Sequence, residues 1–326
     1  MRHLYVITLF FLIPGLQAQT QICYLTILAE GNTATPSGKE AFHSGLYVCN
    51  LNGSALGPLG WPDIKANGLI HSRAGENFYL AAGNGVLQSN DSCKNFKLLT
   101  DWRIAEALAV YQPRDTRFVL FACTASGIWK STDDGKTWEE TDAGLQTLNS
   151  HYVLAMTDLE GEKNKLFICT SDGIWTSIDQ GGSWMRFGLK GKEISAFVVD
   201  PLDSHHLLVS CKNEIYRSDD NGKTWTPVYH SRQELTCVIF DKQAPQRVYA
   251  GGIGTGILVS EDGGLSWKAN TDAVSVHSIL CFSQDKSGGA LYAGTTEGLW
   301  VSVDKGVSFK CITACRAIIT SVFLSE

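Results

Sequence analysis

The sequence predicts an all-β fold, a seven-bladed β-propeller built from four-stranded antiparallel blades. Three observations predict it. A short acidic turn motif recurs along the chain at intervals of 41 to 46 residues. Short apolar runs, bounded by turn-forming residues, lie between its copies. The C-terminal end supplies one strand-like segment too many, and the N-terminal end supplies one too few.

The first 18 residues are expected to form a signal peptide, which leaves residues 19–326 as a single propeller domain. Arg2 precedes an apolar run from Leu4 to Ile13, and a Pro-Gly breaker follows that run. About ten apolar residues cannot cross roughly 30 Å of hydrocarbon. We therefore expect no transmembrane segment and export to the periplasm or the extracellular space.

The composition is that of a globular chain with a small acidic excess. Hydrophobic residues make up 44% and charged residues 18%, and the net charge is −6. Nucleic acid is not expected as a partner, because its recognition needs a basic surface. The chain contains no close metal-ligand spacing such as His-x-x-x-His, so we predict neither a metal site nor a cofactor. We also expect a monomer.

Ten cysteines in an exported chain allow disulfides, yet most are expected to be packed thiols. Three occupy one site in the repeats FACT, FICT and VSCK, where two other repeats have Gly: Cys123, Cys169 and Cys211. A site that accepts Gly or Cys is typical of a small buried slot. Cys237 and Cys281 likewise match each other. Proximity favours Cys311 and Cys315 as a disulfide pair, and their spacing alone does not indicate zinc.

Each repeat contains four strand-like runs. In one unit they are ISAFVV at 194–199, HLLVS at 206–210, EIYR at 214–217 and the run from Trp225 to Tyr229. Such runs are rich in Val, Ile, Phe, Tyr and Trp and are bounded by turn formers, as β-strands are. Four short strands in roughly 42 residues are typical of a propeller blade.

The acidic motif is clearest in STDDGKTW at residues 131–138, and each of its six copies ends in Trp or Phe. We expect its Asp to accept backbone N–H bonds in the hairpin between the third and fourth strands, while the following Gly supplies a positive φ. The terminal ring should pack the turn against the blade. The six aspartates are Asp91, Asp133, Asp179, Asp220, Asp262 and Asp304.

The consensus S-x-D-x-G-x-[ST]-[WF] resembles the Asp-box, also called the BNR repeat, over about residues 40–315. Proteins with such boxes include sialidases, xyloglucan-active glycosidases, sortilin-type receptors and photosystem II assembly and stability factors. The resemblance implies a propeller with its boxes at the periphery, away from the ligand face. It implies no single activity.

The two ends of the chain predict how the ring closes. Residues 45–53 align with residues 298–306, so Leu51 marks a degenerate seventh box. Residues 23–29 supply the second strand of that blade, and nothing upstream supplies the first. Residues 317–324 resemble a first strand with no blade after it. We therefore expect the C-terminal strand to complete the N-terminal blade, which removes the open sheet edges.

A ligand is expected on the face opposite the boxes, where fourth strands lead into first strands and second strands turn into third strands. Residues near the channel mouth form the candidate constellation, although each could equally be a solvated loop residue: Glu106, His151, Glu193, Glu234, His277 and Arg316. Mixed His and carboxylate side chains suit binding or acid–base chemistry. No catalytic residue stands out.

Two functions remain open for this face. The first is an exported, non-catalytic module that binds or scaffolds a protein or glycan, similar in layout to the assembly-factor branch of the family. The second is a glycoside hydrolase, which needs two carboxyl groups about 5 to 9.5 Å apart. The chain has ten arginines and lacks the Arg-Ile-Pro signature typical of sialidases. Xyloglucan-active relatives use paired propellers, and this chain has room for one. We therefore favour the binding module.

Overall fold

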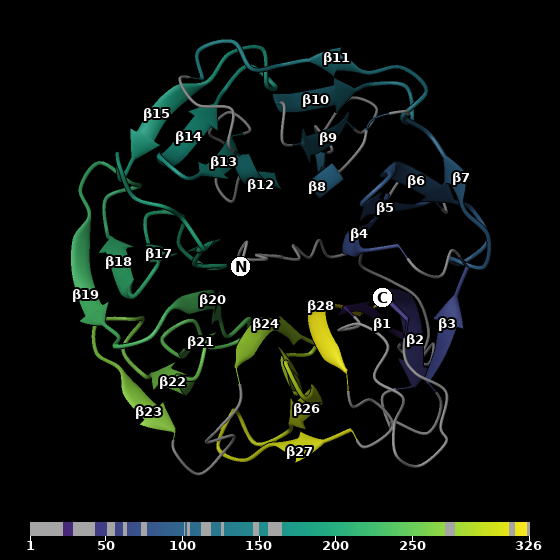
Figure 1. The fold of residues 1–326 in the computed structure, drawn as a ribbon. Coiled ribbons are helices and arrows are strands. Elements are labelled where there is room, and N and C mark those ends of the chain that lie inside the picture. The colour runs from purple at the N-terminus through teal and green to yellow at the C-terminus, as the bar shows by residue number, and fades with distance from the viewer. Residues whose placement is uncertain are drawn as a thin grey trace.

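The computed structural model is a ring of seven four-stranded antiparallel sheets (Figure 1), as the repeats predict. It describes residues 22–28, 43–50, 56–60, 64–72, 77–100, 102, 105–111, 119–124, 127–145, 150–155, 165–270, 278–312 and 317–324. Within these residues the regular secondary structure is all β, and no helix is long and apolar enough to cross a membrane. The expected signal peptide lies outside them.

Six blades follow the chain in order, each running from its first, inner strand to its fourth, outer strand (Figure 1). Blade 2 contains β4 (Ala66–His71), β5 (Phe78–Ala82), β6 (Gly85–Ser89) and β7 (Lys97–Leu98). Blade 3 contains β8 (Ala105–Tyr111), β9 (Val119–Thr124), β10 (Gly127–Ser131) and β11 (Glu139–Glu140). Blade 4 contains β12 (Ser150–Ala155), β13 (Leu166–Thr170), β14 (Gly173–Ser177) and β15 (Met185–Gly188).

The remaining blades complete the ring. Blade 5 contains β16 (Ala196–Val199), β17 (Leu207–Cys211), β18 (Glu214–Ser218) and β19 (Thr226–His230). Blade 6 contains β20 (Leu235–Phe240), β21 (Val248–Gly252), β22 (Gly256–Ser260) and β23 (Lys268–Asn270). Blade 7 contains β24 (Ile279–Gln284), β25 (Leu291–Thr295), β26 (Gly298–Ser302) and β27 (Lys310–Cys311). Blade 1 combines both chain ends as β28 (Ile318–Leu324), β1 (Ile22–Leu28), β2 (Gly45–Asn50) and β3 (Leu56–Leu59).

The second strand of each blade is covered on both sides, because a neighbouring blade packs against each face of the sheet. Every residue of β9, β13 and β17 is buried, whereas both residues of β7 and of β11 are exposed. Two-sided burial explains why the second strands are continuous apolar runs instead of alternating ones. One blade alone cannot provide this cover, so stability depends on stacking around the ring.

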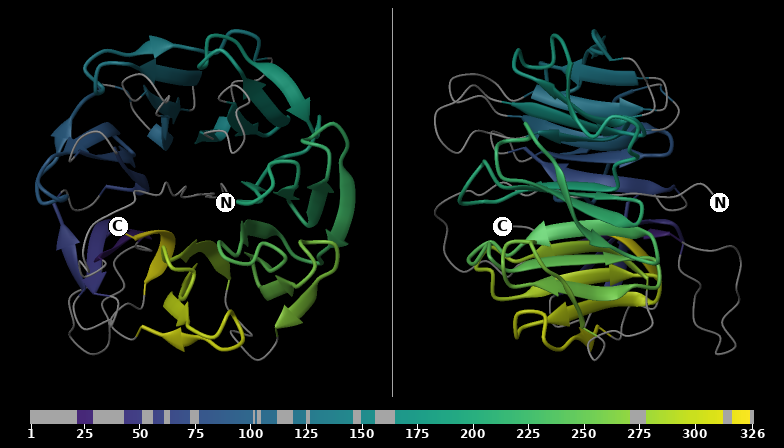
Figure 2. Two further views of the ribbon diagram at one scale, coloured as in Figure 1. Left: turned by 180° about the vertical axis from the view of Figure 1, so that it is seen from behind. Right: turned by 90° about the vertical axis from the view of Figure 1, so that its left-hand side faces the viewer.

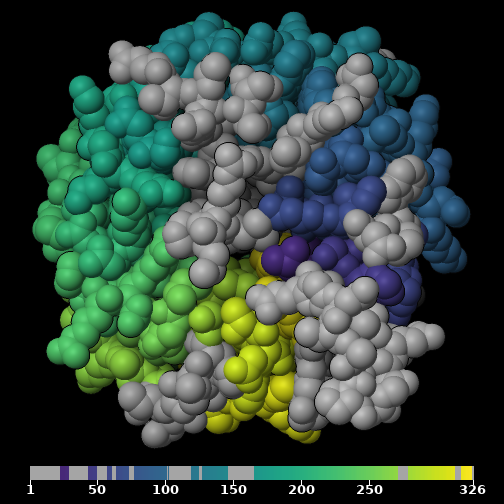
Figure 3. Space-filling model, viewed as in Figure 1, coloured from purple at the N-terminus to yellow at the C-terminus, as the bar shows by residue number. Residues whose placement is uncertain are grey.

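The ring closes within blade 1. β28 pairs antiparallel with β1, with Leu25 opposite Val322 and Tyr24 opposite Phe323. The first and last strands lie side by side, purple against yellow, in Figures 1 and 3. The Oγ1 atoms of Thr26 and Thr320 are 2.7 Å apart. Closure by the C-terminal strand is therefore as predicted, while Leu51, which marks the degenerate box, lies outside the described residues.

One cysteine departs from the predicted register. Cys123 and Cys169 pair with equivalent Ile residues on their third strands. In blade 5 that position belongs to Ser210, and Cys211 lies opposite Glu214 instead. Because successive strand side chains point to opposite faces, this offset of one residue places Cys211 on the other face of its blade. The predicted equivalence of Cys211 with the other two cysteines was wrong.

Eight of the nine described cysteines are buried, and no disulfide joins any two of these nine. Cys237 and Cys281 do occupy equivalent positions, since they pair with Gly251 and Gly294 in adjacent blades. Cys315 lies outside the described residues, so its pairing with Cys311 stays a prediction.

Deletion of residues 317–326 would remove β28 and expose the edge of β1. We expect the shortened protein to unfold at a markedly lower temperature or to form oligomers through the open edge. Thermal unfolding and size-exclusion chromatography with light scattering measure these two results. A truncated protein with unchanged melting temperature and mass would contradict a stabilising role for β28.

Candidate functional site

The antiparallel order of each blade places its turns on two opposite faces of the ring (Figure 2). The turn between the second and third strands lies at the same end as the connection from the fourth strand to the next blade. We call this end the loop face. The Asp-boxes join the third and fourth strands at the other end, which we call the box face.

The Asp-box of blade 3 is a hydrogen-bonded turn. The Ser131 hydroxyl donates to Asp133 Oδ1 at 2.9 Å and accepts the N–H of Gly135 at 2.9 Å. The Asp133 carboxylate accepts the N–H of Thr137 at 2.8 Å and its hydroxyl at 2.7 Å. Asp134 and Gly135 have φ of 65° and 79°, so the turn needs two left-handed residues in succession. The corresponding Ser–Asp pair is present in the other five boxes.

These hydrogen bonds hold the box carboxylates in their charged form. The pKa of each of the six aspartates is lowered to about 2. The largest cause in every box is a hydrogen bond donated by the residue four positions later. The aspartates act on the turn itself, which agrees with their place on the box face.

The box glycine also contacts the preceding blade. A Cβ atom added at Gly135 would lie 2.6 Å from Leu99 of blade 2, and one at Gly181 would lie 2.6 Å from Phe121 of blade 3. The Thr141 hydroxyl of blade 3 donates to the Gly181 carbonyl. The Asp-box therefore closes its own hairpin and forms part of the seam between two blades.

Asp133→Ala should lower the free energy of unfolding by about 1–3 kcal/mol, because it leaves the turn donors without their acceptor. Thr132→Ala is the matched control, since Thr132 is an exposed residue of the same box. Urea unfolding of both variants measures the difference. Equal stability of the two variants would contradict the turn role of Asp133.

Acid should destabilise the protein through the boxes. The pKa of the box aspartates is about 2 in the folded protein and about 3.9 in the unfolded chain. Their contribution to the free energy of unfolding is therefore complete above the unfolded pKa and is lost as the pH falls through the folded pKa. We expect the melting temperature to fall between about pH 4 and about pH 2. Asp133→Asn should show a smaller fall than the wild type over this window, since Asn does not titrate. Parallel melting curves against pH for the two proteins would contradict this coupling.

The structure describes the side chains of two of the six predicted ligand-face residues. Glu193 and Glu234 are half-buried and precede β16 and β20 on the loop face. Glu106 and His151 are the second residues of β8 and β12, and only their backbone positions are described. His277 and Arg316 lie outside the described residues. The role of all six residues in ligand binding stays a prediction.

A β-bulge recurs in the first strands near the loop face, and sequence reasoning missed it. The register with the second strand shifts at one residue in each of six blades: Asn67, Glu106, His151, Thr236, Leu280 and Thr320. Bulges re-aim side chains and are frequent beside functional sites. Glu106 and His151 therefore occupy equivalent bulge positions in their blades. Glu234 does not, because the bulge of its blade is at Thr236, two residues later. A polar residue, present at all of these positions except Leu280, was the available sequence signal.

Two ion pairs join the connection before β16 to the β17–β18 turn. Lys192 Nζ lies 2.8 Å from Glu214 Oε2, which also accepts the hydroxyl of Tyr216 at 2.9 Å. Glu193 Oε2 lies 3.6 Å from Lys212 Nζ. Glu193, one of the predicted residues, is therefore already engaged with a neighbouring charge.

A second ordered group lies on the loop face of blade 4. Arg186 Nη2 lies 2.8 Å from Asp172 Oδ2, and the N–H of Gly191 donates to Asp172 Oδ1 at 2.7 Å. The Arg186 guanidinium stacks on Trp175, 4.3 Å from the ring centre. Such stacking fixes a planar cation in one orientation.

The carboxylates of these groups are held as anions. The hydrogen bond from Arg186 lowers the pKa of Asp172, and the hydrogen bond from Lys192 lowers the pKa of Glu214. A glycosidase acid needs the opposite, a carboxyl whose pKa is raised. Across the described part of the chain, no group of three or more His, Cys, Asp or Glu residues is arranged to hold a metal ion.

Comparison with known proteins supports the repeat and the fold. The family model for the BNR/Asp-box repeat matches residues 216–227, which contain the box of blade 5. No curated protein matches the sequence. The predicted resemblance to Asp-box propellers is thus confirmed for the repeat motif, and the solved structures below extend it to the fold.

Several solved propellers are similar in structure. A GH74 enzyme from Niastella koreensis has a TM-score of 0.65 at 17% identity, over 90% of this chain and 55% of that one. The extracellular domain of BT4673 from B. thetaiotaomicron has a TM-score of 0.60 at 16% identity, over 78% and 34%. YCF48 bound to D1 peptide has a TM-score of 0.56 at 15% identity, over 80% and 86%. This chain therefore spans 55% of the Niastella koreensis enzyme and 34% of the BT4673 domain. Sequence identities this low show a shared fold alone.

Proposed function

We propose that this protein is an exported, monomeric binding propeller that holds a protein segment or a glycan on its loop face. The observation that carries the proposal is the ordered charge on that face. Lys192, Glu214 and Tyr216 are fixed by mutual hydrogen bonds, and Arg186 is fixed by Asp172 and Trp175.

Prearranged polar groups favour recognition, because their side chains lose little conformational entropy when a ligand binds. Their lowered carboxyl pKa values keep the face in one charge state near neutral pH. Exposed groups beside them remain accessible for contacts, including Lys190 and Arg232. This combination suits a ligand with its own polar or anionic groups.

The range of possible partners follows from the similar structures. YCF48, which matches over most of its own length, is known in complex with a peptide, the D1 peptide. That match supports an extended protein segment as one class of ligand for this chain. A glycan is the second class, because the ordered polar groups of Arg186, Asp172, Lys192 and Glu214 suit hydrogen bonding to sugar hydroxyls.

The alternative is a glycoside hydrolase, and the similarity to the GH74 enzyme supports testing it. Incubation of the purified protein with xyloglucan, followed by a reducing-end assay, measures hydrolysis directly. We expect no release of reducing ends. Release that is abolished by Glu193→Gln or Glu234→Gln would replace the binding proposal with an enzymatic one.

Peptide and glycan arrays probed with purified residues 19–326 should yield a ligand. Arg232→Ala should then weaken its binding at least about tenfold, which corresponds to about 1.4 kcal/mol. Lys223→Ala is the matched control, because Lys223 is an exposed cation in the Asp-box of blade 5 on the opposite face. Titration by isothermal calorimetry compares the variants. Equal loss in both variants would contradict a loop-face site, and an absence of binding above background on both arrays would contradict the binding proposal.

A further inference from the structure

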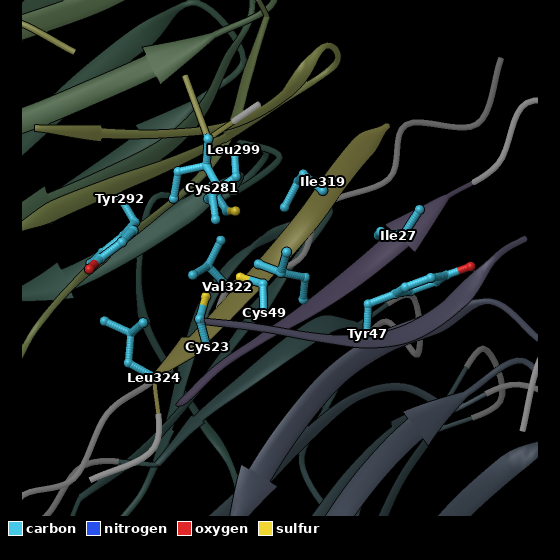
Figure 4. Close-up of a cluster of buried hydrophobic side chains, with 12 residues drawn as sticks. Cys23, Ile27, Tyr47, Cys49, Cys281, Tyr292, Leu299, Ile319, Val322 and Leu324 are labelled. Atoms are coloured by element: carbon cyan, nitrogen blue, oxygen red, sulfur yellow. The ribbon is translucent and has the colours of Figure 1, made fainter. Parts of the chain in front are cut away.

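Two buried thiols face each other in the blade that closes the ring. Cys23 of β1 is the direct antiparallel partner of Cys49 of β2. Their side chains are 0% and 2% exposed and belong to one hydrophobic cluster with Tyr292 and Val322. Figure 4 shows the two sulfur atoms beside each other within this cluster.

This pairing is unusual among the cysteines of the described residues. The strand pairings place each of the others opposite a residue of a different type: Cys123 opposite Ala107 and Ile128, Cys169 opposite Tyr152 and Ile174, Cys211 opposite Glu214, Cys237 opposite Gly251, Cys281 opposite Gly294, and Cys311 opposite Trp300. Cys93 lies in the Asp-box turn of blade 2. Cys23 and Cys49 are therefore the one cross-strand cysteine pair in these registers.

The spacing of directly opposed strand residues suits a disulfide. Their Cα atoms are typically about 4.5–5.5 Å apart, and disulfides span Cα separations of about 4.4–6.8 Å. Bond formation would therefore need little backbone movement. We propose that Cys23 and Cys49 form a cross-strand disulfide when the protein meets a disulfide oxidant, and that this bond clamps the β1–β2 hairpin on which ring closure depends.

The chemistry is a two-step thiol–disulfide exchange. The Cys49 thiolate attacks one sulfur of a small-molecule disulfide, such as oxidised glutathione, and releases one reduced thiol. The Cys23 thiolate then attacks Cys49 Sγ in the mixed disulfide and releases the second thiol. The two protein thiols are oxidised, one oxidant disulfide is reduced to two thiols, and the two protons pass to the released thiolates.

The neighbouring groups favour this pair over other thiols. A hydrogen bond from Cys23 lowers the pKa of Cys49 against the effect of burial, which favours the reactive thiolate. Burial raises the pKa of Cys281, in the same cluster, to about 12. In the folded blade, Cys49 is therefore ionised more readily than Cys281.

The position of the pair sets the consequence of the bond. Both thiols are buried in the closed ring, so an oxidant reaches them before β1 docks or when blade 1 opens locally. The bond would hold β1 against β2 and present the other edge of β1 to β28. It would not link the two chain ends, because β28 remains attached to β1 by hydrogen bonds and packing.

The test compares refolding in two redox conditions. Purified residues 19–326 are unfolded under reducing conditions and refolded either in a mixture of oxidised and reduced glutathione or with a phosphine reductant. Acid quenching, alkylation of remaining thiols and peptide mapping by mass spectrometry then identify the linked cysteines. We expect the linked Cys23–Cys49 peptide after refolding in the glutathione mixture and not after refolding with the phosphine reductant. We also expect the oxidised wild type to unfold at a higher urea concentration than the reduced wild type.

Matched variants make the assignment specific. Cys169→Ala, which removes a buried thiol in blade 4, should keep the linked peptide and the difference between the two midpoints. Cys49→Ala should lose both. The wild-type comparison needs no variant, so it decides the matter even if Cys49→Ala fails to fold. Folded wild type with Cys23 and Cys49 both alkylated after refolding in glutathione, or linked to other cysteines instead of each other, would overturn the proposal.

Discussion

Each blade buries both faces of its second strand only because a further blade stands on either side of it. This mutual cover is the constraint on which the rest of the structure depends. Phe121 is fully buried, yet it belongs to blade 3 and contacts Gly181 in the box of blade 4. The hydrophobic clusters likewise combine residues of neighbouring blades, as Phe167 of blade 4 does with Phe197 of blade 5. Stability is therefore a property of the closed ring.

The Asp-boxes serve that constraint. Their carboxylates close a turn, and their glycines allow the turn to approach the preceding blade closely. Cys93 takes the glycine position in the first box and still adopts a φ of 65°, so a small side chain is tolerated there. The Asp-boxes thus occupy the box face with turns that hold neighbouring blades together, while the second-to-third-strand turns and the connections between blades lie on the loop face. Its connections differ in length and carry the charged groups around Lys192 and Arg186.

Blade 1 closes the ring without a covalent link, because its strands β1 and β28 come from opposite ends of the chain and are joined by hydrogen bonds and packing. The pairing of β1 with β28 supplies the backbone bonds, and the cluster around Leu25, Ile319 and Val322 supplies buried apolar surface. Any bond that stiffens β1 would help the C-terminal strand to find its partner. The facing thiols of Cys23 and Cys49 are placed to do this.

The sequence by itself determined the strands, the boxes, the blade count and the strand that closes the ring, because turn chemistry and runs of apolar residues are local signals that repeat in register. Only the tertiary structure decided which residues face each other. Cys211 lies one residue away from the position that the repeats predict for it, and the bulge positions were not recognised. The Lys192–Glu214 ion pair and the pairing of Cys23 with Cys49 were not predicted either. Side chains alternate between the faces of a strand, so a register difference of one residue, which composition and spacing do not resolve, changes every contact a residue makes.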